Sequence, residues 1–335
     1  MTSNRKNKRI IRDHMERAGL NFLEAKLQLE VAGLIPKPGE PNLLGSSSKA
    51  DRSPLGKVIA VTSARGGTGK STIALALGGY LALSSKLGPG KPLKVLVLDM
   101  DLRDGQIGLF TDSWTPTVMK LLRDGTTAKD IEGAVIHNAG LSVDLLLAPS
   151  RPRSADNLTV EFYEELIGQL KEIYDYIVID TAGSHHDPFR SKVAYPLADR
   201  IILLAENFKS TISASARWAQ GMTYPVEQEG LGIPKDRIGI VLNKVLPGHE
   251  LKGEVVLENA PEIPLIGSIP CNSKLFVDSA NSGELERVLS DPLVGPELRA
   301  VALEIVFGDL SFTELPEIPT REESADPEGP EGSAQ

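Results

Sequence analysis

A glycine-rich loop between an apolar stretch and a helical stretch is the part of this chain best suited to hold phosphate groups. Residues 64–72 read ARGGTGKST. Glycines let backbone N–H groups converge on an anion, and the start of the following helix adds partial positive charge. Lys70 can reach the β- and γ-phosphates of a nucleotide, and Ser71 can offer its hydroxyl to Mg²⁺. This order of residues favours a P-loop over a glycine-rich turn without a ligand.

Carboxylates follow two further apolar stretches, each at its carboxyl end. Asp99 and then Asp101 follow residues 93–98, and Asp180 follows residues 176–179. Four apolar residues and then an aspartate form a Walker B signature, whose carboxylate supports Mg²⁺ beside a P-loop. A carboxylate near the phosphates can also orient water. The alternative interpretation of Asp99 and Asp101 is that they are loop acids exposed to solvent. The predicted magnesium-binding residues are Ser71, Asp99 and Asp180.

Two histidines lie just beyond Asp180, in the run His185-His186-Asp187. Histidine and aspartate are metal-ligand types, but adjacent side chains rarely converge on one ion, and no Cys/His cluster accompanies them. We therefore expect a role in a loop that responds to the nucleotide rather than a dedicated metal site. Sensing of pH by these histidines is a further hypothesis.

Strand-like and helical stretches alternate through the middle of the chain, as expected of an α/β fold. Most of the strand-like stretches are continuous apolar runs, which is typical of strands buried on both faces. We predict a mostly parallel sheet with helices on both faces and ligands at the carboxyl ends of its strands. Predicted strands cover 58–63, 93–99, 141–147, 176–180, 200–205, 238–242 and 265–269, and helices cover 70–83, 117–123, 160–173 and 210–228.

The two ends of the chain differ in composition from its middle. Residues 1–34 combine a basic arm with an apolar seam at helical spacing, and residues 35–55 form a Pro/Gly/Ser-rich linker. Residues 56–308 form the predicted nucleotide-binding domain, and 309–335 an acidic tail predicted to be disordered. The helix within 1–34 could pack on its own domain, bind a partner or a second copy, or lie on a membrane surface.

Charge and cysteine content limit the classes of function. The net charge is −9, divided into +4 for residues 1–20, −6 for 313–335 and therefore −7 for the rest. An acidic body argues against a broad DNA-binding face, although the basic arm leaves DNA binding open. Cys271 is the only cysteine, which excludes a disulfide framework and favours a reducing compartment. No apolar run is long enough to span a membrane and no secretory signal is present, so we expect a cytoplasmic protein.

The loop and its neighbouring acids together resemble the MinD/ParA family of deviant Walker A ATPases. Arg65 stands where that family has its signature lysine, and residues 97–102, VLDMDL, resemble its second motif. The resemblance implies ATP and Mg²⁺ as ligands, an ATP-bound homodimer, and a cation at Arg65 that reaches the partner's ATP. It assigns Asp101 to the attacking water. The catalytic residues expected from it are Lys70, Asp101, Arg65 and Asp180.

The later part of the chain extends the resemblance. Asn243 ends an apolar stretch, and residues 266–270, IGSIP, are similar to a family motif near the base. The resemblance implies that Asn243 bonds the adenine edge and that Pro270 lies beside the base. The expected nucleotide contacts are Gly66, Gly67, Thr68, Gly69, Lys70, Ser71, Thr72, Asn243 and Pro270.

One segment is similar to the CpaE/TadZ branch of this family, whose members localise pilus or secretion machinery. It comprises residues 147–152, LAPSRP, with Ala155 and Asp156. The leading hypothesis is an ATPase that positions cargo, with a protein partner bound through residues 1–34 or the dimer surface. The alternatives are a DNA-partition ATPase that uses residues 1–20 and a nucleotide-gated scaffold without hydrolysis. Because the chain ends acidic, membrane targeting by its C-terminus is not expected.

Overall fold

One eight-stranded sheet organises the part of the chain that the computed structural model describes, which is residues 56–84, 93–183, 187–246, 248–249, 258 and 263–307. Its strand order is β3-β4-β2-β5-β1-β6-β7-β8. β3 is antiparallel to β4, and every other neighbouring pair is parallel. The strands are β1 (Lys57–Ser63), β2 (Val95–Met100), β3 (Ile136–Asn138), β4 (Val143–Leu146), β5 (Tyr176–Thr181), β6 (Arg200–Glu206), β7 (Ile238–Val245) and β8 (Leu265–Pro270).

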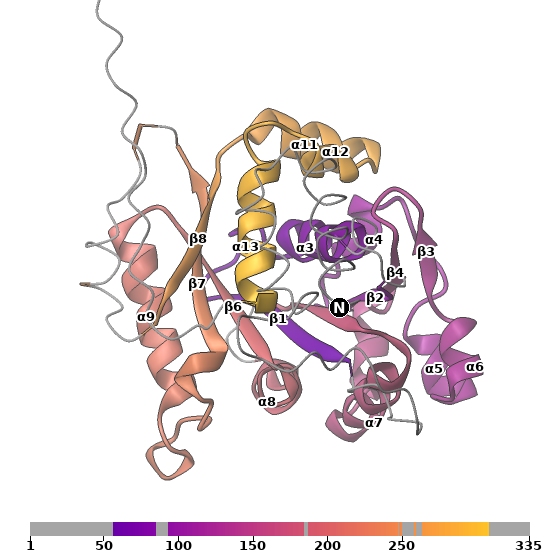
Figure 1. Ribbon diagram of the computed structural model, residues 1–335. Helices are drawn as coiled ribbons and strands as arrows, with labels where there is room; N and C mark the ends of the chain where they lie inside the picture. Colours follow the sequence, from indigo (N-terminus) through magenta and orange to yellow (C-terminus); the bar gives the residue numbers. More distant parts are fainter. Residues whose placement is uncertain are drawn as a thin grey trace, which may run out of the picture.

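Helices cover both faces of this sheet (Figure 1). One face packs against α3 (Lys70–Ser84), α12 (Glu286–Leu289) and α13 (Gly295–Phe307), with α4 (Ile107–Phe110) and α11 (Ser273–Ser282) beside them. The other face carries α5 (Met119–Asp124), α6 (Ala128–Glu132), α7 (Val160–Ile173), α8 (Tyr195–Leu197) and α9 (Lys209–Thr223), and a π-helical turn, η3 (Arg190–Ala194). Short 3-10 turns lie between these elements at Pro152–Asn157, Val226–Gln228 and Lys235–Arg237.

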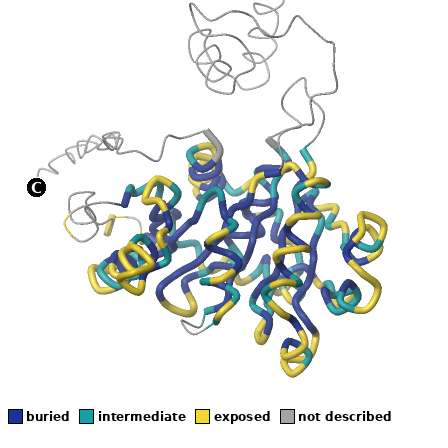
Figure 2. Tube along the Cα trace, turned by 90° about the horizontal axis from the view of Figure 1, so that it is seen from below, coloured by how far each residue is buried: buried dark blue, intermediate teal, exposed yellow. Residues whose placement is uncertain are grey.

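The central strands are buried because successive side chains enter opposite layers. In β1, Val58 and Ala60 pack into the layer of α7 and α9, whereas Ile59 and Val61 pack into the layer of α3 and α13. Figure 2 shows the buried strands as a continuous interior with exposed residues on the outer helices. Burial on both faces is why these strands read as unbroken apolar runs. The predicted mostly parallel sheet with helices on both faces is therefore confirmed.

Some elements differ from the sequence prediction. The antiparallel edge strand β3 and the helices α11 and α13 were not predicted. The helix predicted over 210–228 ends at Thr223, because a residue preceding Pro225 disfavours helical geometry. The predicted arm and helix (1–34), the linker up to residue 55 and the acidic tail lie outside the described residues, as do His185 and His186. Within the described part, no helix is both long and apolar enough to cross a membrane.

Candidate functional site

The glycine-rich loop lies at the centre of the sheet. It connects β1, which lies between β5 and β6, to the first turn of α3, which begins at Lys70. Gly67 and Gly69 have φ values of 75° and 93°, a backbone conformation that residues with a side chain rarely adopt. A Cβ on Gly69 would also lie 2.6 Å from Nδ2 of Asn243. The loop therefore has the strand–loop–helix geometry that the sequence predicted.

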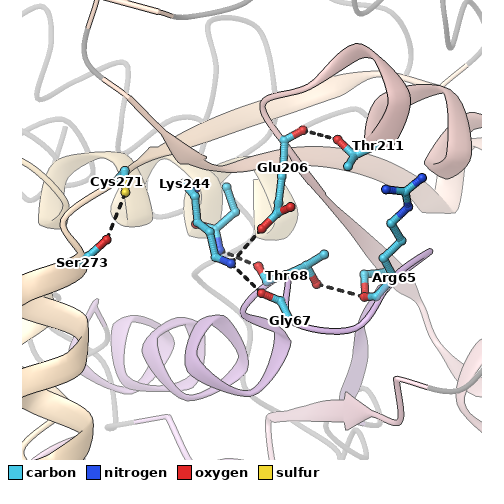
Figure 3. Close-up of polar contacts among 10 residues, drawn as sticks. Arg65, Gly67, Thr68, Glu206, Thr211, Lys244, Cys271 and Ser273 are labelled. Atoms are coloured by element: carbon cyan, nitrogen blue, oxygen red, sulfur yellow. Dashed lines mark hydrogen bonds and ion pairs between the residues drawn. The ribbon is translucent and has the colours of Figure 1, made fainter.

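Arg65 contributes differently through its backbone and its side chain. Its carbonyl accepts hydrogen bonds from the Ser63 hydroxyl at 2.5 Å and the Thr68 hydroxyl at 3.5 Å. Its side chain is exposed and extends away from Lys244 (Figure 3). It lines an open recess of about 430 Å³ with Ala64 and three residues of α9, namely Ala214, Arg217 and Trp218. The guanidinium is thus accessible to a partner molecule.

Two aspartates end neighbouring strands beside this loop. Asp99 of β2 and Asp180 of β5 are register partners, and both are almost fully buried. Neither carboxylate oxygen of Asp180 has a hydrogen-bond partner of normal geometry among the described residues. Burial raises the pKa of Asp180 to about 7, while the nearby Ser71 hydroxyl and Lys70 ammonium oppose that rise. A buried carboxylate that the described residues compensate only through Ser71 and Lys70 is costly unless it serves a ligand.

Lys70 faces both acids that were predicted to work with it. Its side chain is buried, and burial lowers its pKa, whereas the charges of Asp180 and Asp101 act in the opposite direction. Gly183, just after β5, lies close enough that an added Cβ would be 3.7 Å from Nζ of Lys70. The structure therefore brings Lys70, Asp101 and Asp180 into one charged cluster at the carboxyl ends of the strands.

Asp99 has a clear structural task in this site. Its two oxygens accept the backbone N–H groups of Asp101 at 3.1 Å and Ile107 at 3.2 Å. Burial and the charge of Asp180 raise its pKa well above the ordinary value, and the two backbone N–H groups act against that. The carboxylate thus shapes the loop that carries Asp101. Its predicted contact with Mg²⁺ stays a prediction.

Asn243 reaches the glycine-rich loop from the end of β7. Its Nδ2 donates to the Thr68 carbonyl at 2.7 Å, and its Oδ1 accepts the Lys244 N–H at 2.9 Å. This places the side chain against the loop and leaves its predicted adenine contact untested. Pro270 ends β8, which is separated from β1 by β6 and β7. Its predicted place beside the base is likewise a prediction.

Arg190 supports the site and was not singled out from the sequence. It is buried in the π-helical turn and donates to the Tyr195 hydroxyl at 2.8 Å, the Thr62 hydroxyl at 2.7 Å and the Ser63 carbonyl at 2.9 Å. It therefore fixes the end of β1, directly before the loop. A single arginine in a helical stretch carries no pattern that would reveal this. Glu206 ends β6 and accepts a hydrogen bond from Lys244 at 2.7 Å beside the loop; as an acid that follows an apolar run, like Asp99 and Asp180, it could have been noted from the sequence.

Comparisons with known proteins agree with this geometry. Residues 56–206 match the family model described as an AAA domain. The chain is 29% identical over 271 residues to the septum site-determining protein MinD of Synechocystis sp., covering 78% of this chain and 93% of that protein. By its loop, its sheet and these relatives, the chain is similar to the MinD/ParA family of P-loop ATPases. The predicted resemblance to the MinD/ParA family is thereby confirmed, and the role of Arg65 in a deviant Walker A loop stays a prediction.

Solved structures of MinD/ParA proteins share the fold. A ParA family ATPase from Chlorobium tepidum superimposes with a TM-score of 0.63 at 20% identity, covering 75% of this chain and 99% of that one. MinD from Pyrococcus horikoshii, solved in complex with Mg-ADP, gives a TM-score of 0.58 at 21% identity, covering 75% and 96%. These relatives include both septum-site and partition-type proteins. They do not single out the CpaE/TadZ branch within the MinD/ParA family.

Proposed function

We propose that this chain binds ATP with Mg²⁺ at the loop between β1 and α3 and hydrolyses it. The observation that carries the proposal is the buried carboxylate of Asp180, which lies near Ser71 and Lys70 and has no hydrogen-bond partner of normal geometry among the described residues. A carboxylate, a hydroxyl and an ammonium at the start of a helix form the donor and acceptor set that a P-loop offers to a metal–nucleotide complex.

Mg²⁺ fits the residues at this place. Mg²⁺ prefers oxygen ligands and is usually held by one or two protein groups together with substrate phosphates and water. Ser71 and Asp180 supply such oxygens, and among the described residues no group of three or more His, Cys, Asp or Glu side chains could hold a metal alone. Mg²⁺ bound there would offset phosphate charge and stabilise the buried charge of the Asp180 carboxylate.

Each side chain of the cluster has a chemical task in this proposal. Backbone N–H groups of the loop and the ammonium of Lys70 hold the β- and γ-phosphates. Asp101 accepts a hydrogen bond from the attacking water and aligns it with the γ-phosphorus. Asp99 keeps Asp101 in place through the two backbone N–H groups that it accepts. Catalysis in this class of reaction rests on such positioning and on charge stabilisation.

We further propose that ATP joins two copies of this chain and that hydrolysis separates them. The exposed guanidinium of Arg65 supports this, because it can reach beyond its own loop and offers two parallel N–H donors to a phosphate. The dimer would position a protein cargo in the cytoplasm. Relatives named septum site-determining proteins support a task in positioning. Residues 1–34 or the dimer surface would bind that cargo.

Two paired measurements test the proposal: ATP turnover, and molar mass in solution with ATP against ADP. The full chain should turn over ATP and double its mass with ATP. Lys70→Ala should abolish both effects. Arg65→Ala should keep ADP binding and lose most of the ATP turnover. The control Arg217→Ala makes the same change of charge in the same recess and should keep the ATP turnover. Equal turnover in the wild type and Arg65→Ala would remove the action of Arg65 on the partner's ATP.

Partition of DNA is the second candidate, favoured by the +4 charge of residues 1–20 and by the ParA-type fold. It requires DNA binding that weakens with salt and that disappears on removal of residues 1–20. A scaffold gated by nucleotide without hydrolysis is the third. A single-turnover measurement that shows bound but uncleaved ATP would favour it over the ATPase.

A further inference from the structure

The ammonium group of Lys244 joins the glycine-rich loop to the end of β6. Its Nζ donates to the Gly67 carbonyl at 2.6 Å and to Oε1 of Glu206 at 2.7 Å (Figure 3). Lys244 lies at the end of β7, and the backbone carbonyl of Glu206 accepts the Thr211 hydroxyl of α9 at 2.6 Å. A single side chain of β7 therefore connects the glycine-rich loop to the end of β6.

Peptide geometry gives this contact a consequence for the loop. In a planar trans peptide, the N–H points opposite to the C=O of the same unit. Lys244 holds the Gly67 carbonyl, and the neighbouring Asn243 holds the Thr68 carbonyl at 2.7 Å. The N–H groups of Thr68 and Gly69 are consequently turned away from the end of β7. Two successive peptide units of the loop are thus fixed in the orientation that a phosphate-binding loop needs.

The backbone of Lys244 is strained in a way that aims its side chain at the loop. Its φ is 58°, in the left-handed region, which is unfavourable for a residue other than glycine. The pairing of β7 with β8 shifts register between Leu242 and Val245, around this position. The Lys244 N–H is held by Oδ1 of Asn243 at 2.9 Å. Strain of this kind persists only where surrounding contacts compensate it.

We propose that Lys244 is a positioning residue that orients the glycine-rich loop for phosphate, with Glu206 as its counter-ion. Lys244 acts through the Gly67–Thr68 peptide and does not touch the reacting atoms. Glu206 keeps the ammonium on the carbonyl side of the loop by pairing with it. The inference rests on the proposed binding of nucleotide and adds to it the residues that prepare the loop. Fixing the loop before binding reduces the entropy lost when the phosphates are bound.

The test compares Lys244→Gly with Lys244→Arg in the full chain. Glycine removes the ammonium and also relieves the backbone strain, so a loss of fold is not expected. Glu229→Gly is the matched control, because Glu229 has a φ of 61° and follows the short turn after α9, outside the loop contacts. The readouts are the Kd of fluorescently labelled ADP with Mg²⁺, the KM and kcat for ATP, and the urea midpoint without nucleotide.

For Lys244→Gly we expect an ADP affinity and a KM about fivefold weaker, as for one lost charge-assisted hydrogen bond that is partly exposed. The kcat should stay within about twofold and the urea midpoint close to that of the control. Lys244→Arg should restore most of the affinity, and Glu206→Gln should lose less than Lys244→Gly. Wild-type affinity in Lys244→Gly, or a loss that arginine does not restore, would overturn the inference. A wild-type chain that binds no ADP would overturn the proposed function and this inference with it.

Discussion

Replacing Asp180 by asparagine should stabilise the nucleotide-free protein and at the same time remove its activity. The carboxylate is fully buried without a hydrogen-bond partner of normal geometry among the described residues, and its pKa is raised from 3.8 to about 7. Asparagine has nearly the same shape and carries no charge. It therefore resembles the protonated acid, which is the form that this site favours when no ligand is present.

The size and sign of the effect follow from proton linkage. A raised pKa means that the folded state holds a proton that the unfolded state has released, so stability falls as pH rises from 3.8 to about 7 and is constant above. At 1.36 kcal/mol per tenfold change in proton affinity, the raised pKa of Asp180 lowers stability by about 4 kcal/mol at pH 8, where the buried group is charged. At pH 5, where the folded protein still holds the proton, it lowers stability by about 1.5 kcal/mol. These values are the upper limits of the gain expected for Asp180→Asn.

Urea unfolding at pH 5 and pH 8, with EDTA and without nucleotide, measures this difference. We expect a gain for Asp180→Asn that is larger at pH 8 by about 3 kcal/mol at most. The pKa of Asp99 should also fall once the Asp180 charge is removed, which acts in the same direction. Turnover of ATP by the same variant should be lost, because the carboxylate proposed to support Mg²⁺ is missing.

Asp278→Asn is the control for this experiment. Asp278 lies on the exposed face of α11, and a hydrogen bond from Lys274 lowers its pKa, so its removal should change stability little and with the opposite dependence on pH. If Asp180→Asn is no more stable than the wild type at pH 8, or if its gain is equal at both pH values, the buried charge is compensated and the argument for a ligand at this carboxylate fails.

Three further predictions follow from the same site. Gly69→Ala should abolish nucleotide binding, because a Cβ would lie 2.6 Å from Nδ2 of Asn243 at a φ of 93°; normal ADP titration by calorimetry would contradict this. Asp101→Asn should reduce kcat by about a hundredfold with ADP affinity unchanged, as for loss of a group that positions the attacking water, and a steady-state assay that gives wild-type kcat would exclude that role. Arg190→Lys should lower the free energy of unfolding by about 2–3 kcal/mol, since the guanidinium reaches its three acceptors from two separate nitrogens, Nε and Nη2, and a compact ammonium cannot span them. An unchanged urea midpoint would show that these acceptors are satisfied otherwise.

The sequence alone was sufficient for the parts of the site that are local in the chain. The strand, the glycine-rich turn and the helix that begins at Lys70 follow one another directly in the chain. The backbone conformation of each is set mainly by residues close by in the sequence. Burial on both faces of a parallel sheet is also visible in the sequence, because each such strand is an unbroken apolar run, here followed by Asp99 or Asp180. Because parallel strands share one carboxyl edge, the meeting of these acids with the loop could be expected as well.

The tertiary structure alone decided which distant side chains support that loop. Lys244 and Gly67 are 177 positions apart, and Arg190 reaches Thr62 over 128 positions. Neither cation belongs to a periodic or spaced pattern, so nothing in the order of residues marks it. Strand order places the end of β7 beside the loop, and a left-handed backbone turns Lys244 toward it. Contacts of this kind arise from how the strands are arranged, and that arrangement is a property of the whole packed sheet rather than of any one segment.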